Sequence, residues 1–484
     1  MNTPSVFQAA VYANIASGTG NTIVDAVAGS GKTTTIMGAL ASVPSGCTIA
    51  LFAFNKSIAT ELGARAPRGV EVKTLHAHGF SAVRRAFPGV KVDNDKSIAL
   101  CVALFGASDN LHPVRSRYSA VADLVSKAKD TLVARGDLFA LDDLIDVFGI
   151  DCPDSDDDRA LFVDAAMAVL VRSSEVTDVV DFSDMCWLPV VLNLRVWSYD
   201  RVFVDETQDL SPTQIELLLL CMKRNGRICA VGDERQAIYG FRGADVNTIP
   251  NLIKRLDATV LPLSITYRCA RSIAALAATE VPHFTASDNA AEGYVGPSNT
   301  DAMIEAAVAG DMVISRANAP LMTLCLKFLA SGRRASIKGR DVGAGIARLV
   351  KKSRARSVPA FLEWSKAWHK KETARLVKSE RPTDAADDML ECLFALAEGA
   401  KGVPEILTRC DSLFSDEGGP ETKITLGTTH KLKGLEADRV WMLEGTYRRN
   451  KGGEEANCWY VAVTRAKSSL YLVAKEAWKK TPGQ

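Results

Sequence analysis

The segment that constrains the fold most is a glycine-containing loop near the start of the chain, Ala26-Val27-Ala28-Gly29-Ser30-Gly31-Lys32-Thr33. It matches the phosphate-binding pattern G-x-x-x-x-G-K-[ST] except at its first position, where alanine replaces glycine. An apolar run, 22–24, precedes the loop and an amphipathic segment, 34–40, follows it. A strand that turns through glycines into a helix points backbone N–H groups at phosphate oxygens. The loop therefore predicts a nucleotide site in an α/β fold.

Within this loop, we expect Lys32 to reach the β- and γ-phosphates and Thr33 to ligate Mg²⁺. The backbone contacts would come from the residues just before them, Ala28, Gly29, Ser30 and Gly31. The alternative interpretation is an ordinary glycine-rich turn between a strand and a helix.

A pair of carboxylates strengthens the nucleotide interpretation. The apolar run 202–204 ends directly in Asp205 and Glu206. Carboxylates at the end of a buried strand are costly unless they bind a cation or take part in chemistry. Asp205 would hold Mg²⁺, directly or through water, and Glu206 would orient and deprotonate the attacking water. An isolated Asp-Glu pair can merely cap a helix, but downstream of a phosphate-binding loop it predicts a nucleotide hydrolase.

Further short apolar runs indicate buried strands at 48–54, 201–204, 227–231, 311–315, 423–428, 439–443 and 469–473. Because helical segments separate them, they predict two α/β units with parallel sheets. Two stretches, about 93–181 and about 341–421, lack strand signals and are expected to be helical. The second begins with a basic run from Arg333 to Arg356, which is either solvated surface or a phosphate-contacting surface near Trp364 and Trp368.

The charge balance excludes one class of protein. Lys and Arg number 58 against 57 Asp and Glu, a formal charge of +1, so a small histone-like binder that relies on bulk charge is excluded. The same balance does not exclude a protein with a basic groove on an otherwise neutral surface.

No apolar run approaches membrane-spanning length, and no secretory signal is visible at the N-terminus. The 11 cysteines form no C-x-x-C pair, which argues for free thiols and against a disulfide framework or structural zinc site.

Later motifs carry a family resemblance. They occupy 204–209 (VDETQD), 231–244 (VGDERQAIYGFRGA), 266–268 (TYR), 428–436 (TTHKLKGLE) and 460–466 (YVAVTRA). With the phosphate-binding loop, this set and order resembles the UvrD/Rep-like branch of superfamily 1 DNA helicases. The segment 54–57 (FNKS) is also similar to the eukaryotic F-box DNA helicases of this branch.

The resemblance implies two RecA-like domains with ATP between them. The first would comprise 1–92 and 182–257 with a helical insertion at 93–181. The second would comprise 258–340 and 422–484 with a reduced helical insertion at 341–421. At 81 residues (421 − 341 + 1) that insertion is much shorter than in the longer relatives, which leaves duplex gripping and self-inhibition open.

The resemblance also implies residue roles in the ATP site. Gln8 would read the adenine and Tyr267 would stack on it, whereas Thr34 stands where relatives often carry an arginine near the base. The resemblance further implies that Gln236 and Arg268 sense the γ-phosphate, that Glu436 and Gly434 contact the nucleotide, with Glu436 at the ribose, and that Arg465 is the arginine finger. The alternative for Arg268 and Arg465 is a structural role in ion pairs.

For DNA, the resemblance implies a single strand bound across both domains. Phe241 would stack on bases, with Tyr239 and Arg242 beside it. The further candidate contacts are Phe54, Asn55, His76, Thr429 and His430. Phe54 and Tyr239 have an alternative as ordinary core aromatics.

The function that the resemblance implies is an ATP-dependent helicase or translocase that uses Mg²⁺ and moves 3′ to 5′ on single-stranded or partly duplex DNA. The alternatives are a translocase that displaces proteins with little unwinding, and an ATP-gated DNA-binding regulatory module. We expect a monomer with no membrane association, in the cytoplasm of a bacterial or phage-infected cell and associated with the nucleoid. Replication or recombination proteins are the expected partners.

Overall fold

The computed structural model describes residues 3–109, 111–153, 155–240, 247–378, 382–414, 419–449 and 453–474. The chain folds into two compact units. The first unit comprises Met1–Val27 with Gly31–Ser264, and the second comprises Ala28–Ser30 with Ile265–Gln484.

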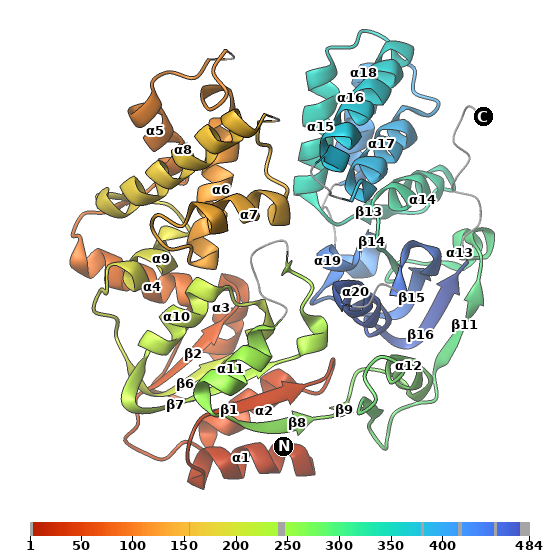
Figure 1. The fold of residues 1–484 in the computed structure, drawn as a ribbon. Helices are drawn as coiled ribbons and strands as arrows, with labels where there is room; N and C mark the ends of the chain where they lie inside the picture. The colour runs from red at the N-terminus through yellow and green to blue at the C-terminus, as the bar shows by residue number, and fades with distance from the viewer. Residues whose placement is uncertain are drawn as a thin grey trace. The chain divides into compact units, whose positions relative to one another are not determined.

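Six parallel strands form the sheet of the first unit, in the order β3-β2-β6-β7-β1-β8 (Figure 1). Their bounds are β1 Thr22–Ala26, β2 Ile49–Ala53, β3 Val70–Thr74, β6 Tyr199–Val204, β7 Met222–Gly232 and β8 Thr259–Leu263. In register, Val202 of β6 lies beside Ala50 of β2 and Ile228 of β7. Because the strands are parallel, their carboxyl ends all reach the same edge of the sheet.

Helices cover both faces of this sheet, which explains why its strands are apolar runs. One face packs on α1 (Val6–Ser17), α2 (Lys32–Ala41) and α3 (Lys56–Arg65) through a core that contains Val24 and Phe203. The core on the other face contains Ile23 and Val202 and draws on four helices. These are α4 Leu75–Ala86, α9 Asp184–Val191, α10 Pro212–Leu220 and α11 Thr248–Leu256.

The first insertion is a helical subdomain with its own core. Its helices are α5 Lys96–Phe105, α6 Tyr118–Thr131, α7 Leu138–Phe148 and α8 Asp156–Glu175, with the short helix η1 Arg115–Arg117. Val121, Phe162 and Leu170 lie at its centre, each fully buried, and Trp187 of α9 packs against the same cluster. Two short parallel strands, β4 (Lys91–Val92) and β5 (Val179–Val180), pair where the chain enters and leaves this subdomain.

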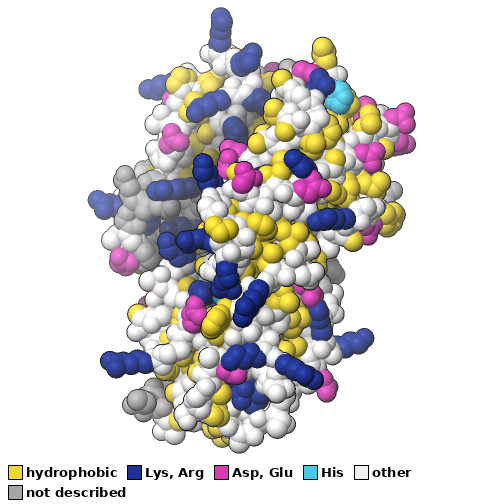
Figure 2. All heavy atoms as spheres, turned by 90° about the vertical axis from the view of Figure 1, so that its left-hand side faces the viewer, with side chains coloured by type: hydrophobic (Ala, Val, Ile, Leu, Met, Phe, Trp, Pro, Cys, Tyr) yellow, Lys and Arg dark blue, Asp and Glu magenta, His cyan; other side chains and the backbone are white. Residues whose placement is uncertain are grey.

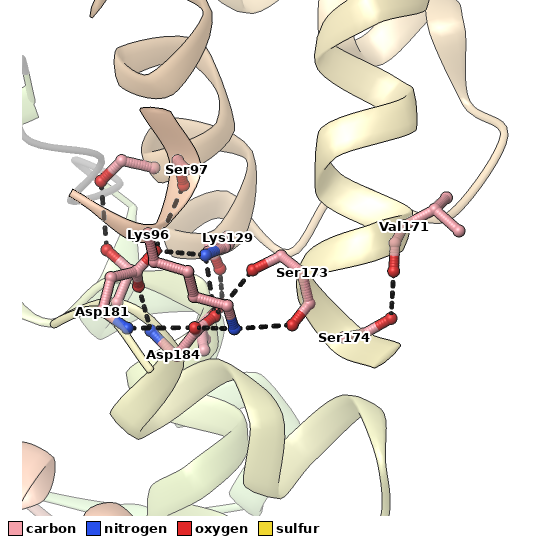
Figure 3. Close-up of polar contacts among 11 residues, drawn as sticks. Lys96, Ser97, Lys129, Val171, Ser173, Ser174, Asp181 and Asp184 are labelled. Atoms are coloured by element: carbon pink, nitrogen blue, oxygen red, sulfur yellow. Dashed lines mark hydrogen bonds and ion pairs between the residues drawn. The ribbon is translucent and has the colours of Figure 1, made fainter. Parts of the chain in front are cut away.

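A buried ionic cluster joins this insertion to the rest of the first unit (Figure 3). Lys96 Nζ lies 2.6 Å from Asp184 Oδ2, and Lys129 Nζ lies 2.8 Å from Asp184 Oδ1 and 2.5 Å from Asp181 Oδ2. Lys129 and Asp184 are fully buried. Burial lowers the pKa of Lys96, although Asp184 opposes the shift. Buried charges persist only when paired, so the insertion is fixed to α9 by mutual neutralisation.

The second unit contains another six-stranded parallel sheet, in the order β11-β16-β15-β12-β14-β13. The strands are β11 Tyr294–Ser298, β12 Met312–Ser315, β13 Ala335–Ile337, β14 Ile424–Thr428, β15 Ala437–Leu443 and β16 Ala466–Val473. Its helices are α12 Arg271–Ala277, α13 Thr300–Ala306, α14 Ala319–Ala330, α19 Thr429–Leu432 and α20 Gly453–Val463. A small parallel pair, β9 Ile265–Thr266 with β10 Thr285–Ala286, accompanies them.

The second insertion shares its core with this sheet. Its helices are α15 Arg340–Ser353, α16 Val358–Lys378, α17 Asp384–Ala397 and α18 Val403–Leu413. Ile346, Phe361 and Leu393 of these helices lie in one buried cluster with Leu426 of β14 and Phe328 of α14. The two insertions therefore differ: the first has a core of its own, and the second extends the core of its sheet.

The α/β fold class with two parallel sheets is confirmed, and each predicted apolar run lies on a strand. The expectation that 93–181 lacks strands is wrong at Val179–Val180, a pair too short to give a pattern. The domain boundaries at 92, 181, 257, 340 and 421 stay predictions. Within the described residues, no helix is long and apolar enough to cross a membrane.

Candidate functional site

The phosphate-binding loop follows β1 at the carboxyl edge of the first sheet. Gly29 and Gly31 have φ angles of 72° and 79°, a left-handed conformation that glycine adopts without strain. Helix α2 begins at Lys32, and no side chain caps its first turn. Ser30 Oγ is buried and has no hydrogen-bond partner. Open helix N–H groups and an unsatisfied buried hydroxyl suit a phosphate ligand.

Lys32 lies against the carboxylate of Glu206, with Nζ 3.0 Å from Oε2. The Lys32 side chain is only 12% exposed, and burial alone would favour its neutral amine. The carboxylates of Glu206 and Asp233 outweigh burial and raise the Lys32 pKa, so the side chain is an ammonium ion. The structure thus brings together the two residues that sequence analysis assigned to the phosphates and to the attacking water.

Asp205 and Glu206 follow β6, two strands from β1. Burial, and then the charge of Glu206, raise the pKa of Asp205 to about 7. Glu206 has a φ of 52° and a ψ of 45°, a left-handed conformation that is rare for a residue other than glycine. Such backbone strain concentrates at functional positions.

A chain of hydrogen bonds extends from this pair to β7. Gln208 Nε2 donates to Glu206 Oε2 at 2.6 Å, and Gln208 Oε1 accepts from the Asp233 N–H at 3.0 Å. Gln236 Nε2 in turn donates to Asp233 Oδ2 at 2.7 Å. Sequence analysis missed Gln208 and Asp233, although both lie inside the motifs 204–209 and 231–244. Gln236, predicted to sense the γ-phosphate, belongs to the same network.

The donor set fits a magnesium–nucleotide complex. Asp205 is a buried carboxyl whose charged form would gain from a nearby cation, and Thr33 carries a hydroxyl in the first turn of α2. Oxygen donors of this kind are what Mg²⁺ prefers.

Gln8 is placed by the start of α1. Its side chain accepts from the Ser5 N–H at 3.1 Å, which completes a capping box, and donates to Thr35 Oγ1 at 3.2 Å. Both ends of the amide are therefore engaged locally, and its adenine-reading role stays a prediction. Thr34 is exposed on α2.

The described DNA candidates of the first unit follow three strands at the same carboxyl edge: Phe54 and Asn55 follow β2, His76 follows β3, and Tyr239 follows β7. Phe54 stacks on Tyr239, with centroids 6.3 Å apart and planes 4° from parallel. Asn55 accepts from the Ile58 N–H at 2.9 Å as the N-cap of α3. The Phe54–Tyr239 stack shows that these rings also have a packing role.

His76 lies in the first turn of α4 and stacks on Phe182, with ring centroids 4.0 Å apart. Burial lowers the pKa of His76 to about 4, so it is neutral at neutral pH and brings no cation to a phosphate. Phe241 and Arg242 lie outside the described residues.

In the second unit, two nucleotide candidates lie at the amino ends of strands, whereas Tyr267 and Arg268 follow the short strand β9. Glu436 directly precedes β15 and Arg465 directly precedes β16. Arg268 Nε lies 2.5 Å from Glu436 Oε2, and Lys467 Nζ lies 3.2 Å from Glu436 Oε1. These cations lower the Glu436 pKa in spite of its burial. Tyr267 is 53% exposed, as a residue that stacks on a base must be.

The Arg465 side chain is hydrogen-bonded to backbone carbonyls of the second unit. Its side chain is 1% exposed, and it donates to the Val461 carbonyl at 2.9 Å and the Leu435 carbonyl at 3.1 Å. Gly434 has a φ of 87° in the turn before β15, where glycine is favoured. The arginine-finger role stays a prediction.

Thr429 and His430 lie at the opposite edge, just after the carboxyl end of β14. Thr429 is fully buried, and its hydroxyl lies 2.7 Å from that of Tyr447. His430 Nε2 lies 3.5 Å from Glu454 Oε1. Glu436 and Arg465 therefore lie at the opposite edge of this sheet from Thr429 and His430.

Comparison with known protein families agrees with this geometry. The UvrD/REP helicase N-terminal domain matches residues 8–257, and the UvrD-like helicase C-terminal domain matches residues 350–477. The chain belongs to the UvrD/Rep-like helicase family. The first match contains the phosphate-binding loop and the Asp205–Glu206 pair, and the second contains the Thr429 and Arg465 motifs. The two parallel sheets are therefore the RecA-like domains of this UvrD/Rep-like chain.

Relatives of this UvrD/Rep-like chain include helicases of bacteria and of a vertebrate. ATP-dependent DNA helicase Rep of Salmonella typhimurium is 27% identical over 288 residues, 52% of this chain and 39% of Rep. F-box DNA helicase 1 of Gallus gallus is 27% identical over 308 residues, 57% of this chain and 29% of that protein. ATP-dependent DNA helicase PcrA of Leuconostoc citreum is 33% identical over 128 residues, 25% of this chain and 17% of PcrA. The chain thus covers well under half the length of these relatives.

Proposed function

We propose that this protein is an ATP-dependent DNA helicase or translocase. The observation that carries the proposal is the Lys32–Glu206 ion pair at 3.0 Å, beside the buried Asp205, at the carboxyl edge of a parallel sheet. A cation for phosphates, a base for water and a carboxyl for a metal are the groups that nucleotide hydrolysis needs. Similarity to relatives named ATP-dependent DNA helicases supports DNA as the second substrate.

The geometry indicates how Lys32 and Glu206 would act. The phosphates of ATP compete with Glu206 for the Lys32 ammonium group, so nucleotide binding would release the carboxylate. Gln208, which donates to Glu206 Oε2, would hold that carboxylate in place while it takes a proton from the attacking water. When bound at Asp205 and Thr33, Mg²⁺ would supply charge neutralisation to the phosphates.

We assign charge stabilisation during phosphoryl transfer to Arg268 and Arg465 on the family resemblance. In the structure, Arg268 pairs with Glu436 and Arg465 donates to backbone carbonyls. Each arginine would therefore exchange these partners for phosphate oxygens in the hydrolytic state.

On the same resemblance, we propose 3′-to-5′ movement on single-stranded DNA and action in the cytoplasm as a monomer, with replication or recombination proteins as partners. A translocase that displaces proteins with little unwinding is the second candidate, because the second insertion, 341–421, is short. Strand displacement from a 3′-tailed duplex, measured beside streptavidin displacement from a biotinylated single strand, separates the two.

The Glu206→Gln variant tests the hydrolytic site. Glutamine keeps the size of the side chain but cannot accept the proton, so ATP turnover should fall by about 10²- to 10⁴-fold. ATP binding should persist, measured with a fluorescent ATP analogue. Retained turnover in this variant would refute the assigned role, and an equal loss of binding and turnover would indicate a structural one.

A further inference from the structure

Three potential metal ligands converge at the carboxyl edge of the second sheet. His430 lies on α19, directly after β14, and Glu454 and Cys458 lie on α20. Because Glu454 and Cys458 are four residues apart, they occupy the same face of that helix. These three residues form no recognisable sequence motif, because the cysteine has no C-x-x-C partner and the histidine is far from it along the chain.

The spacing of the three side chains suits a tetrahedral ion. His430 Nε2 lies 3.5 Å from Glu454 Oε1 and 3.9 Å from Cys458 Sγ, and all three ligand atoms lie within 4.8 Å of one another. Zinc bonds of about 2.0–2.3 Å at tetrahedral angles place neighbouring ligand atoms about 3.3–3.8 Å apart. Small side-chain adjustments would close the remaining gap.

We propose that His430, Glu454 and Cys458 form a three-ligand site for Zn²⁺ or a similar divalent transition metal. Imidazole, carboxylate and thiolate are the ligands that zinc takes in proteins. Three protein ligands leave a fourth position for water. His430 also lines a groove of about 1960 Å³ in the second unit, which provides a path for the ion.

The surroundings permit a divalent charge. Arg316 and Lys433 both act electrostatically on Cys458, as do the carboxylates of Glu454 and Glu455. Arg316 Nη2 lies 2.8 Å from Glu455 Oε1, so the charge of this arginine is already paired. Cys458 is fully buried, whereas the His430 and Glu454 side chains are 14% and 33% exposed. Because the thiol is buried and the other two side chains are partly exposed, solvent reaches the group of three ligands from one side.

Metal binding must displace a proton. Burial raises the pKa of the Cys458 thiol to about 12, so the thiol is protonated in the metal-free protein at neutral pH. On binding, the S–H bond breaks, the proton passes to solvent and a metal–thiolate bond forms without a change in oxidation state.

Cobalt(II) spectroscopy tests the site without reference to ATPase activity. The full-length, metal-free protein is titrated with Co²⁺ in the absence of nucleotide. One equivalent should produce a thiolate-to-cobalt charge-transfer band, which added Zn²⁺ removes. Binding of Co²⁺ at Asp205 and Thr33 gives no such band, because those ligands lack sulfur.

Matched variants assign the band. Cys458→Ser should abolish it and Glu454→Gln should weaken Co²⁺ affinity at least tenfold, whereas Cys47→Ser, at a partly exposed free cysteine, should leave it intact. Unchanged thermal melting of each variant confirms that it is folded. Absence of the band in the wild-type protein, or its persistence in Cys458→Ser, would overturn the proposal. Neither result bears on the proposed function, which the ATPase of the Glu206→Gln variant tests separately.

Discussion

At the residue scale, the hydrolytic site depends on side chains that orient Glu206 as much as on Glu206 itself. Gln208 bridges Glu206 and the Asp233 backbone, across two neighbouring strands. A hydrogen bond to a charged group contributes about 1.5–3 kcal/mol. Under the proposed function, Gln208 would therefore position the carboxylate that receives the proton.

We expect Gln208→Ala to lower kcat by about tenfold or more, since 1.4 kcal/mol in the barrier corresponds to a factor of ten. ATP affinity should change little, because Gln208 has no assigned contact with the nucleotide. Steady-state ATPase kinetics provide the measurement. Gln214→Ala, which removes a capping residue of α10 outside the network, is the matched control. An equal kcat for the two variants would exclude the positioning role.

Asn55 has two candidate roles that substitution can separate. Because Asn55 is the N-cap of α3, Asn55→Ala should lower the free energy of unfolding by about 1 kcal/mol. Asn55→Asp keeps the cap but adds a negative charge, so stability should hold while affinity for single-stranded DNA falls. Chemical denaturation and fluorescence anisotropy measure the two effects. If both variants keep wild-type DNA affinity, Asn55 is only a cap.

Sequence patterns predicted Lys32, Asp205 and Glu206 because each stands at a fixed position in a motif. They could not predict that Gln208 bonds to Asp233, since that contact requires β6 and β7 to be neighbours in the sheet. They also could not predict that Gln8 is engaged by Ser5 and Thr35. The identities of site residues follow from motifs, whereas their partners follow from topology.

At the element scale, buried strands were predictable and edge strands were not. Central strands such as β6 are continuous apolar runs because helices cover both faces. The edge strands β3 and β8 have mostly exposed or half-buried residues, and β8 contains Pro262. Proline is tolerated there because an edge strand leaves backbone groups unpaired. At the edges of the second sheet, β11 was missed for the same reason, whereas β13 is buried but has only three residues, too few to give a pattern.

The ionic cluster of the first insertion predicts a large stability effect at one lysine. Lys129→Met leaves Asp181 and Asp184 buried without their shared cation, so the free energy of unfolding should fall by about 3–5 kcal/mol. Urea denaturation, followed by circular dichroism, measures it. Arg172→Met, in the half-exposed Arg172–Glu175 pair, should cost about 1 kcal/mol or less. Similar losses for both variants would contradict the account of the cluster.

At the scale of the whole molecule, the near-neutral charge is compatible with the proposed motor, which would have to release DNA in each cycle. On the face drawn in Figure 2, Lys and Arg side chains are interspersed with Asp and Glu instead of forming one continuous basic area. Affinity that rests on stacking and a few phosphate contacts falls less steeply with salt than affinity that rests on bulk charge.

The central claim is that ATP hydrolysis at Lys32, Asp205 and Glu206 is coupled to single-stranded DNA. The most direct test is the steady-state ATPase rate of the full-length protein, measured with and without an unstructured oligonucleotide. We predict at least about tenfold stimulation by DNA, equivalent to 1.4 kcal/mol of barrier, and no stimulated hydrolysis in Glu206→Gln. A wild-type rate that is the same with and without DNA would contradict the claim.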